Sequence, residues 1–538
     1  MKPSALSVDL EDAGNAACKP DAGAGGGMFR PSRICYAAVV STAFWALLLF
    51  GRSDNAGGEE SVLVNPSAFS LPLLSGISGG RRPPVQQSPS IPDGKSSSPS
   101  SPDDSGVRDR CAGRYIYMYD LPPRFNADLV RGCSNLRPWM DLCPYVANCG
   151  MGQPLQAADA DEGKGGAFPV GHQRGWYATD QFMLDVIFHC RMKRHACVTP
   201  DPSRAAAVFV PFYASLDGGR HLWNSTSARD ALALDLVDWL SRRPEWRAAG
   251  GRDHFFAAGR TTWDFRRETD ADEEWGTKLL NIPAVRNMTV LVLETSPWHH
   301  TTNLAVPYPT DFHPASAADL AAWQEAARGA ERTWLFSFVG APRPGSGGKT
   351  ARAEIIRQCG ASRRCTHLQC TKPSSTEPSS CESSRGGVMR VMGRSTFCLQ
   401  PRGDTPTRRS TFDAVLAGCV PVFFHPDSAY TQYTRHLPGD PAKYSVLIMH
   451  TDLTDRNASI EDTLSRIPPE KVTAMREEVI RLIPRVVYAD PRSRRVDFQD
   501  AFDLALDAVI DRVAKRRRRR VAAAPSSSKN ADHPSVVG

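Results

Sequence analysis

The chain has 538 residues, of which 41% are hydrophobic and 42 are prolines, so it is long enough for two or three domains joined by proline-rich connectors. Its formal net charge is +7, but Lys515–Arg520 alone supplies six positive charges, and the rest of the chain is close to neutral. This charge balance gives no reason to expect a nucleic-acid partner.

The N-terminal part has the pattern of a membrane anchor. Residues 1–33 are polar and rich in glycine and alanine, which predicts a disordered cytosolic tail. Ile34–Gly51 contains no charged residue, and as a helix it would span about 27 Å, enough to cross a bilayer core. A cleavable signal peptide is the main alternative, but no small-residue cleavage site follows closely. Because basic residues are more frequent before this segment than after it, the positive-inside rule predicts a single-pass type II signal anchor with a lumenal body.

Residues 52–110 form a Pro- and Ser-rich stem that has too little apolar surface to fold. The body after it holds twelve of the 14 cysteines. They lack the paired CxxC spacing of a zinc site, so disulfides in an oxidising lumen are favoured, with a connectivity that the sequence does not give. Three N-glycosylation sequons lie in the same body, at Asn224, Asn287 and Asn457.

Strand and helix patterns alternate along the body. In residues 111–325, short apolar runs predict the strands Arg114–Tyr119, Ala206–Tyr213, His254–Ala258 and Thr289–Leu293. Helical spacing predicts the helices Tyr177–His189 and Ala231–Leu240. A second alternating set occupies residues 326–515 and starts at Thr333–Val339, after a connector around Pro314–Glu331. Such alternation predicts an α/β fold of two Rossmann-like domains, each a parallel sheet covered by helices, facing a cleft. Asp500–Arg512 is a candidate to pack back on the first domain, and residues 516–538 are expected to be a disordered basic tail.

The chemistry is concentrated in STFCLQPRGDTPTRRSTFDAVLAGCVPVFFHP, which runs from Ser395 to Pro426. It predicts a buried strand, a loop, a short helix with Ser410 as its N-cap and Gly418 after its end, and a second buried strand. The loop delivers Arg408 and Arg409 to a helix N-terminus, where unpaired N–H groups already favour an anion. Spacing alone leaves open the alternative that both arginines are solvated loop charges.

Several motifs in the same order carry a family resemblance. They are CAGRYIYMYDLPPRFN, GWYATDQFMLDVIFHC, AAAVFVPFYASLD, DHFFAAGRTTWDF, VPYPTDFHP, FCLQPRGDTPTRRSTFDAVLAGCVPVFFHP with SAYTQYTRHLP after it, and SIEDTLSRIPPEKVTAMREEVIRLIPRVVYADPRS. Together they span Cys111 to Arg512 and closely resemble the exostosin-like glycosyltransferases of family 47, nearest to the plant xyloglucan galactosyltransferase branch. The resemblance implies a GT-B-type fold and inverting transfer of a sugar from a nucleotide donor.

The resemblance implies a Golgi membrane enzyme that moves galactose from UDP-galactose to xylosyl side chains of xyloglucan, a cell-wall polysaccharide. Two alternatives stay open. One is a family member that uses another donor, such as galacturonic acid or arabinose, or another acceptor. The other is an inactive glycan-binding scaffold of a Golgi synthase complex, although the retained arginines and Asp413 argue against it. Association with itself or with other Golgi transferases is left open.

Inverting transfer needs stabilisation of the diphosphate, recognition of the nucleoside and a base for the acceptor hydroxyl. The donor-binding candidates are Gly403, Thr407, Arg408, Arg409, Ser410 and Asp413. The two arginines would hold the diphosphate, while Asp413 would bind ribose hydroxyls, complete the helix cap, or do both.

The base is expected at the carboxyl end of a strand in the first domain. The candidates are Asp264 in GRTTWDF, then Glu294 at the end of VLVLE, then His313 in PYPTDFHP. The aromatic residues Trp263, Trp298 and Tyr308 are candidates to stack on a glycan acceptor, with core packing as the alternative.

No metal or other cofactor is expected, because the arginines would neutralise the diphosphate as a divalent ion does. The D-x-D patterns Asp159–Asp161 and Asp270–Asp272 have no strand before them and are interpreted as surface charge. Three positions depart from the branch pattern: Pro406, Asp427 and Arg435. Arg435 would suit the carboxylate of a uronic-acid donor if it pointed into the cleft.

Overall fold

The structure is a computed structural model, and it describes residues 109, 111–137, 140–155, 174–296, 302–343, 350–371 and 379–522. The chain divides into two compact units, Met1–Ser105 and Gly106–Gly538, and every described residue belongs to the second unit. The predicted membrane segment Ile34–Gly51 and the stem therefore lie outside the described residues, apart from Asp109. None of the helices in the described ranges is long and apolar enough to cross a membrane.

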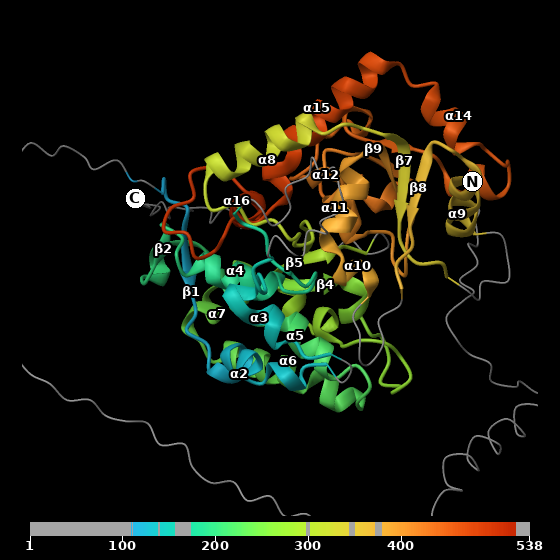
Figure 1. Ribbon diagram of the computed structural model, residues 1–538. Coiled ribbons are helices and arrows are strands. Elements are labelled where there is room, and N and C mark those ends of the chain that lie inside the picture. Colours follow the sequence, from blue (N-terminus) through green and yellow to red (C-terminus); the bar gives the residue numbers. More distant parts are fainter. Residues whose placement is uncertain are drawn as a thin grey trace, which may run out of the picture. The chain divides into compact units, whose positions relative to one another are not determined.

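The first half of the body is built on a six-stranded sheet with the order β2-β1-β3-β4-β5-β6, in which every pairing is parallel (Figure 1). Its strands are β1 (Tyr115–Met118), β2 (Val198–Thr199), β3 (Ala205–Phe209), β4 (His254–Thr261), β5 (Thr289–Glu294) and β6 (Asn303–Ala305). β4 and β5 are buried over their whole length, as continuous apolar runs in a parallel sheet with two covered faces should be. All four strands predicted for this half are confirmed, with shifted ends.

Helices cover both faces of this sheet, as predicted. They are α2 (Ala127–Arg131), α3 (Cys143–Gly150), α4 (Leu184–Met192), α5 (Ala214–Arg220), α6 (Thr226–Ser241) and α7 (Pro244–Ala249). Successive strand residues point to opposite faces: Phe255 and Ala257 pack in one apolar cluster with α4, whereas Phe256 and Ala258 pack in another with α6 and α7.

The second half contains a five-stranded sheet with the order β11-β10-β9-β7-β8, again parallel throughout. Its strands are β7 (Trp334–Val339), β8 (Cys365–Leu368), β9 (Ser395–Gln400), β10 (Val420–Phe423) and β11 (Val446–Leu447). Its helices are α8 (Ala317–Gly329), α9 (Ala351–Ala361), α10 (Ser380–Ser383), α11 (Arg385–Gly393), α12 (Arg409–Leu416), α13 (His450–Thr454), α14 (Ile460–Ser465) and α15 (Pro469–Val486). In Figure 1, α11 and α12 lie on one side of this sheet and α9 and α14 on the other. The α/β class with two parallel sheets is thus confirmed.

Short 3-10 segments connect these elements. They are η1 (Pro123–Phe125), η2 (Cys133–Asn135), η4 (Pro202–Arg204), η5 (Thr262–Phe265), η6 (Leu279–Asn281), η7 (Val285–Asn287), η8 (Pro426–Ser428) and η9 (Pro441–Lys443).

The predicted connector around Pro314–Glu331 is largely helical, because α8 occupies most of it. Trp323 of α8 is fully buried, and its indole N–H donates to the carbonyl oxygen of Leu416 in α12, at 2.9 Å. Its ring also lies 4.6 Å from that of Trp176 in the first half. The predicted domain boundary at residue 325 therefore falls inside a helix that packs on both halves.

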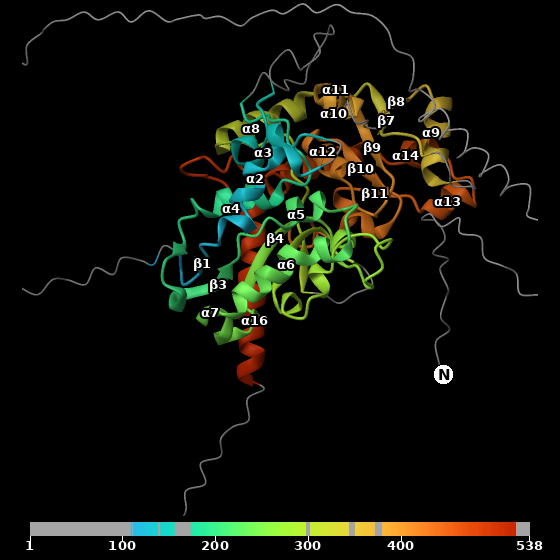
Figure 2. The ribbon, with the colours of Figure 1, turned by 90° about the horizontal axis from the view of Figure 1, so that it is seen from below.

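The last helix, α16 (Ala501–Ala522), returns to the first half. Phe502 packs on Phe188 of α4, with ring centroids 4.5 Å apart, and Figure 2 shows α16 running beside β3. The tail predicted to be disordered from residue 516 is instead helical to Ala522. Arg516 donates to the carbonyl oxygen of Asn287 at 3.1 Å and Arg517 to that of Ala205 at 3.4 Å, so the basic run begins as part of a packed helix.

Disulfides are present, as the cysteine pattern predicted. The pairs are Cys111–Cys197, Cys133–Cys143, Cys149–Cys190, Cys359–Cys365, Cys370–Cys381 and Cys398–Cys419. Every cysteine that follows the predicted membrane segment is therefore paired. Of the sequon residues, Asn224 and Asn457 are exposed, whereas Asn287 is partly buried.

Candidate active site

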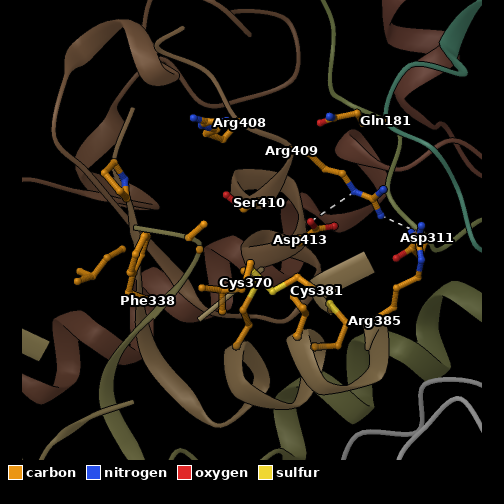
Figure 3. A pocket seen from close by; sticks show the side chains of 18 of the residues that line it. Gln181, Asp311, Phe338, Cys370, Cys381, Arg385, Arg408, Arg409, Ser410 and Asp413 are labelled. Carbon is orange, nitrogen blue, oxygen red and sulfur yellow. Dashed lines mark hydrogen bonds and ion pairs between the residues drawn. A yellow bond between two sulfur atoms is a disulfide. The ribbon is translucent and has the colours of Figure 1, made fainter. Parts of the chain in front are cut away.

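A cavity of about 400 Å³ lies between the two halves, at the carboxyl ends of β7 and β9. The second half contributes Phe338–Arg343, the pocket-facing side of α11, and the start of α12. The first half contributes Thr179–Gln181 and Asp311. Figure 3 shows Arg408, Arg409, Ser410 and Asp413 around this space. Ligands of open parallel sheets bind at this position, outside the carboxyl ends of the strands.

Three arginines concentrate positive charge on the wall of the cavity formed by the second half. Arg343 follows β7, Arg352 opens α9, and Arg408 precedes α12. Burial, and then the charges of Arg408 and Arg343, lower the pKa of Arg352 to about 10. Arg343 has a partner in the exposed carboxylate of Asp404, at 2.7 Å. Cationic groups that repel one another in a partly enclosed space favour a bound anion.

The guanidinium of Arg408 occupies space that is free only because residue 403 of the same loop is a glycine. A Cβ atom added to Gly403 would lie 0.8 Å from Nη2 of Arg408, so any side chain at position 403 would displace the guanidinium from the cavity. The Nε atom of Arg408 is buried and has no hydrogen-bond partner among the described residues. Burial followed by the charge of Arg343 lowers the pKa of Arg408. An unpaired buried donor in a cationic cluster is the feature that the diphosphate hypothesis requires.

Arg409 points toward a different set of groups. Its guanidinium pairs with Asp311 at 2.7 Å and with Asp413 at 3.5 Å, and it donates to the carbonyl oxygen of Thr179 at 2.6 Å. Arg385 of α11 pairs with the same Asp311 carboxylate. Asp311 and Thr179 belong to the first half, so Arg409 and Arg385 connect the two halves beside the cavity (Figure 3).

The start of α12 differs from the predicted cap. The N-cap position is occupied by Arg408, without a side-chain cap, and the Ser410 hydroxyl donates to Oε1 of Gln400 in β9, at 2.6 Å. Asp413 does not cap the helix either; its carboxyl lines the cavity. Burial raises its pKa to about 6, assisted by Asp311 and opposed by Arg409. Gly418 has φ = +63°, as predicted for the residue after a helix end.

Of the three candidate bases, Glu294 alone contacts the loop before α12 that is predicted to bind the donor (residues 401–408, the donor loop). Its Oε2 atom accepts hydrogen bonds from the backbone N–H and the hydroxyl of Thr407, at 2.8 and 2.7 Å. The Tyr308 hydroxyl lies 3.1 Å from the Thr407 hydroxyl. Burial raises the pKa of Glu294, and the hydrogen bonds from Thr407 oppose that rise. Like the other two candidates, Glu294 does not line the cavity, but it places a carboxylate of the first half against the loop that carries Arg408.

The other two candidates are engaged elsewhere. The Asp264 carboxylate accepts from the Trp275 indole N–H at 2.7 Å and pairs with Arg260 at 3.3 Å, and it does not line the cavity. His313 is fully buried: its Nδ1 lies 2.8 Å from the carbonyl oxygen of Tyr488 and its Nε2 2.9 Å from the Thr179 hydroxyl. Burial lowers its pKa to about 4.

Arg435, the position suggested for a uronate, faces α16. It pairs with Asp511 at 3.3 Å and does not line the cavity between the halves. The prediction that Arg435 could be a cation for the carboxylate of a uronic-acid donor is therefore wrong. Of the two D-x-D patterns, Asp159–Asp161 lies outside the described residues. Asp270 contacts Lys278, and Asp272 accepts from the backbone N–H of Thr226.

Sequence reasoning missed Arg343, Arg352, Arg385 and Asp311. The signal for Arg343 was available, since TWLFSFVGAPR places it just after a predicted strand. Asp311 lies in the VPYPTDFHP motif, two positions before the histidine that was singled out. Arg385 and Arg352 come from helices and are identified only by the packing.

Comparison with known proteins gives consistent matches. The family model described as the exostosin GT47 domain matches residues 110–464. The xyloglucan galactosyltransferase MUR3 of Arabidopsis thaliana is 43% identical over 92% of this chain and 85% of its own length. From the same plant, the xyloglucan galactosyltransferase XLT2 is 40% identical over 76% of this chain and 77% of its own length. A xyloglucan-specific galacturonosyltransferase is 38% identical over 75% of this chain and 58% of its own length.

Proposed function

The chain belongs to the exostosin GT47 family of glycosyltransferases, and we propose that it transfers galactose from UDP-galactose to xylosyl side chains of xyloglucan. The similarity to MUR3 and XLT2 supports the choice of galactose and xyloglucan. The observation that carries the proposal is the cluster of Arg343, Arg352 and Arg408, which faces first-half residues across a cavity at the strand ends. We assign the two sheets to the two halves of a GT-B-type fold.

The proposed reaction is a single inverting displacement. The acceptor hydroxyl oxygen attacks the anomeric carbon as the bond from that carbon to the diphosphate breaks, and a base takes the hydroxyl proton. Negative charge grows on the leaving diphosphate, so Arg408 and its neighbours would stabilise the transition state more than the bound donor. Glu294 is the base that the geometry favours, because it is the candidate that contacts the donor loop.

The test is a transfer assay with the purified full-length chain, several UDP-sugars and xylosylated glucan oligosaccharides. We expect galactose transfer from UDP-galactose. Transfer from UDP-galacturonic acid but not from UDP-galactose would contradict the choice of sugar and retain the mechanism. Binding of xyloglucan without transfer from any donor would instead support a scaffold.

The same assay tests the proposal that no metal takes part. Among the described residues, Cys133, Asp141 and Cys143 form the group with metal-ligand spacing, but the two cysteines form a disulfide and so offer no thiolate. We propose that arginines replace the divalent ion at the diphosphate. The rate should therefore be the same in EDTA, and loss of activity that manganese restores would contradict this part of the proposal.

We propose that the body is lumenal and anchored in the Golgi membrane. Six disulfides and the exposed sequon residues Asn224 and Asn457 support an oxidising, glycosylating compartment. Digestion of the expressed chain with an endoglycosidase should increase its mobility on a gel. An unchanged mobility, together with protease sensitivity of the body in intact vesicles, would place the body in the cytosol.

A further inference from the structure

Among the described residues of the first half, two tryptophan side chains are largely exposed. Trp223, between α5 and α6, is 71% exposed, and Trp263, in η5, is 63% exposed. A third indole belongs with them, because the Trp275 ring lies edge-on to that of Trp223, with centroids 5.6 Å apart. Trp263 adjoins this pair, because its neighbour Asp264 accepts the Trp275 indole N–H at 2.7 Å, and we call Trp223, Trp263 and Trp275 the tryptophan surface. Large aromatic groups are usually mostly buried, and neighbouring apolar groups left exposed mark binding sites.

The loop beneath this surface is held rigidly. Trp275 donates its indole N–H to the Asp264 carboxylate at 2.7 Å, which fixes one ring relative to the segment that carries Trp263. The buried Arg229 side chain donates to the carbonyl oxygens of Glu274 and Gly276, at 2.6 and 3.1 Å. Gly276 has φ = +85°, and a Cβ there would lie 2.7 Å from the Asp264 carbonyl oxygen. A surface fixed in this way loses little conformational freedom when a ligand binds.

The tryptophan surface begins beside the proposed reaction centre. η5 directly follows β4, and the last residue of β4, Thr261, is the register partner of Glu294 in β5. Arg260, which pairs with Asp264, lies with its guanidinium 4.4 Å over the Phe182 ring. Phe182 follows Gln181, which lines the cavity. Contacts from Trp275 through Asp264 and Arg260 to Phe182 therefore connect the loop that carries the indoles to the chain segment that lines the cleft.

We propose that the tryptophan surface binds the neutral glucan backbone of a polymeric acceptor, several sugars away from the hydroxyl that reacts. This inference rests on the proposed function, because it extends the acceptor site of that reaction. The flat C–H faces of β-linked glucose stack on indole rings, which present large apolar faces at low entropic cost. The reacting xylosyl branch would lie in the cleft while the backbone crosses Trp263 and Trp223.

The charges around the surface favour a neutral occupant. The exposed acidic residues of the adjoining loop are Glu268, Asp270, Asp272 and Glu273, and of these Asp270 is paired with Arg267 and Lys278. An anionic polysaccharide or an acidic lipid surface would be repelled at this rim, whereas a neutral glucan would not. A hydrophobic protein partner is the remaining competitor, and the experiment below distinguishes it.

The test compares a polymeric acceptor with a short one. In the full-length chain, Trp223→Ala and Trp263→Ala should each raise KM for polymeric xyloglucan by roughly tenfold, the loss expected when one well-packed aromatic contact is removed. The values of KM for a single xylosylated oligosaccharide and for UDP-galactose should stay the same, as should kcat. Trp223→Tyr should retain most of the polymer affinity. Leu234→Ala is the matched control, because Leu234 of α6 is 53% exposed but has no aromatic face.

The outcomes separate this inference from the proposed function. An unchanged polymer KM, or an equal rise for both acceptors, would contradict the tryptophan surface while leaving the transferase intact. A change of oligomeric state in the alanine variants, without an effect on polymer KM, would show a protein contact instead. If the wild-type chain transfers no sugar, affinity electrophoresis in gels that contain xyloglucan still tests the tryptophan surface. Slower migration of the wild type than of the alanine variants would support glucan binding at this surface. Equal mobility of all three proteins would overturn it.

Discussion

Replacing Arg408 with alanine should lower kcat by about a hundredfold or more, because one preorganised donor to a developing charge contributes on the order of 3 kcal/mol. Its Nε atom is buried without a partner among the described residues, and the ion pairs between those residues do not include its guanidinium, so we expect its removal to break few internal contacts. The cluster loses a mutually repelling charge. We therefore expect the thermal unfolding midpoint to stay the same or rise. The measurement is kcat for galactose transfer together with a thermal unfolding curve.

Arg409→Ala is the matched comparison, because Arg409 is the adjacent residue and has the same side chain. Its guanidinium connects Asp311 and Thr179 of the first half to α12, so its removal leaves a buried carboxylate with fewer partners. A buried charge left without any partner costs about 3 kcal/mol or more of stability, and the cost here should be smaller because Arg385 still pairs with Asp311. We expect Arg409→Ala to lower the unfolding midpoint clearly, with any loss of turnover following from that. If both variants unfold like the wild type and lose turnover equally, the two arginines share one role at the diphosphate.

A further variant separates geometry from charge. Gly403→Ala should displace the Arg408 guanidinium, since the added methyl group would occupy its position. The charges of Arg408 and Arg409 would both remain. A loss of turnover close to that of Arg408→Ala would show that the position of the guanidinium matters. Wild-type turnover in Gly403→Ala would show that the charge alone suffices.

The sequence predicted the elements well because their signals are local. The strand ending at Gln400, the short helix and Gly418 are determined by apolar runs and by a residue that tolerates positive φ. The loop that we propose binds the donor was singled out from the same stretch. The partners of each side chain were not predictable, because they come from distant segments. Arg409 and Arg408 are adjacent and look alike in sequence, yet one is paired with Asp311 and the other lies in the arginine cluster.

Distant packing also explains the expectations that were not met. Asp264 occupies a favourable place after a strand, but Arg260 and Trp275 reach it from either side along the chain and use both of its oxygens. The tail after residue 515 is strongly basic, yet Arg516 and Arg517 donate to backbone carbonyl groups near the amino ends of β5 and β3. Arg435 was suggested for the cleft from its place in a motif, whereas α16, which it contacts, follows much later in the chain.

Replacing Glu294 with glutamine should lower kcat by about a hundredfold to ten-thousandfold, the usual contribution of a general base. Glutamine keeps the size of the side chain and an oxygen that can accept the hydrogen bonds of Thr407. The donor loop should therefore keep its position, and KM for UDP-galactose should change little. Glu294→Ala, which also removes the contact with Thr407, should in addition raise that KM. The measurement is steady-state kinetics of both variants with a saturating oligosaccharide acceptor.

The pH dependence decides whether Glu294 acts as the base or positions the loop. A base works when it is deprotonated, and burial raises the pKa of this carboxyl above its usual value. In the wild type, kcat should therefore fall as the pH drops through that raised pKa. In Glu294→Gln the residual activity should lack this acidic limb, because the group that titrates is gone. A variant that loses turnover but keeps the same limb would make Glu294 a positioning residue. Asp413 would then be the next candidate, since its carboxyl lines the cavity and burial raises its pKa to about 6.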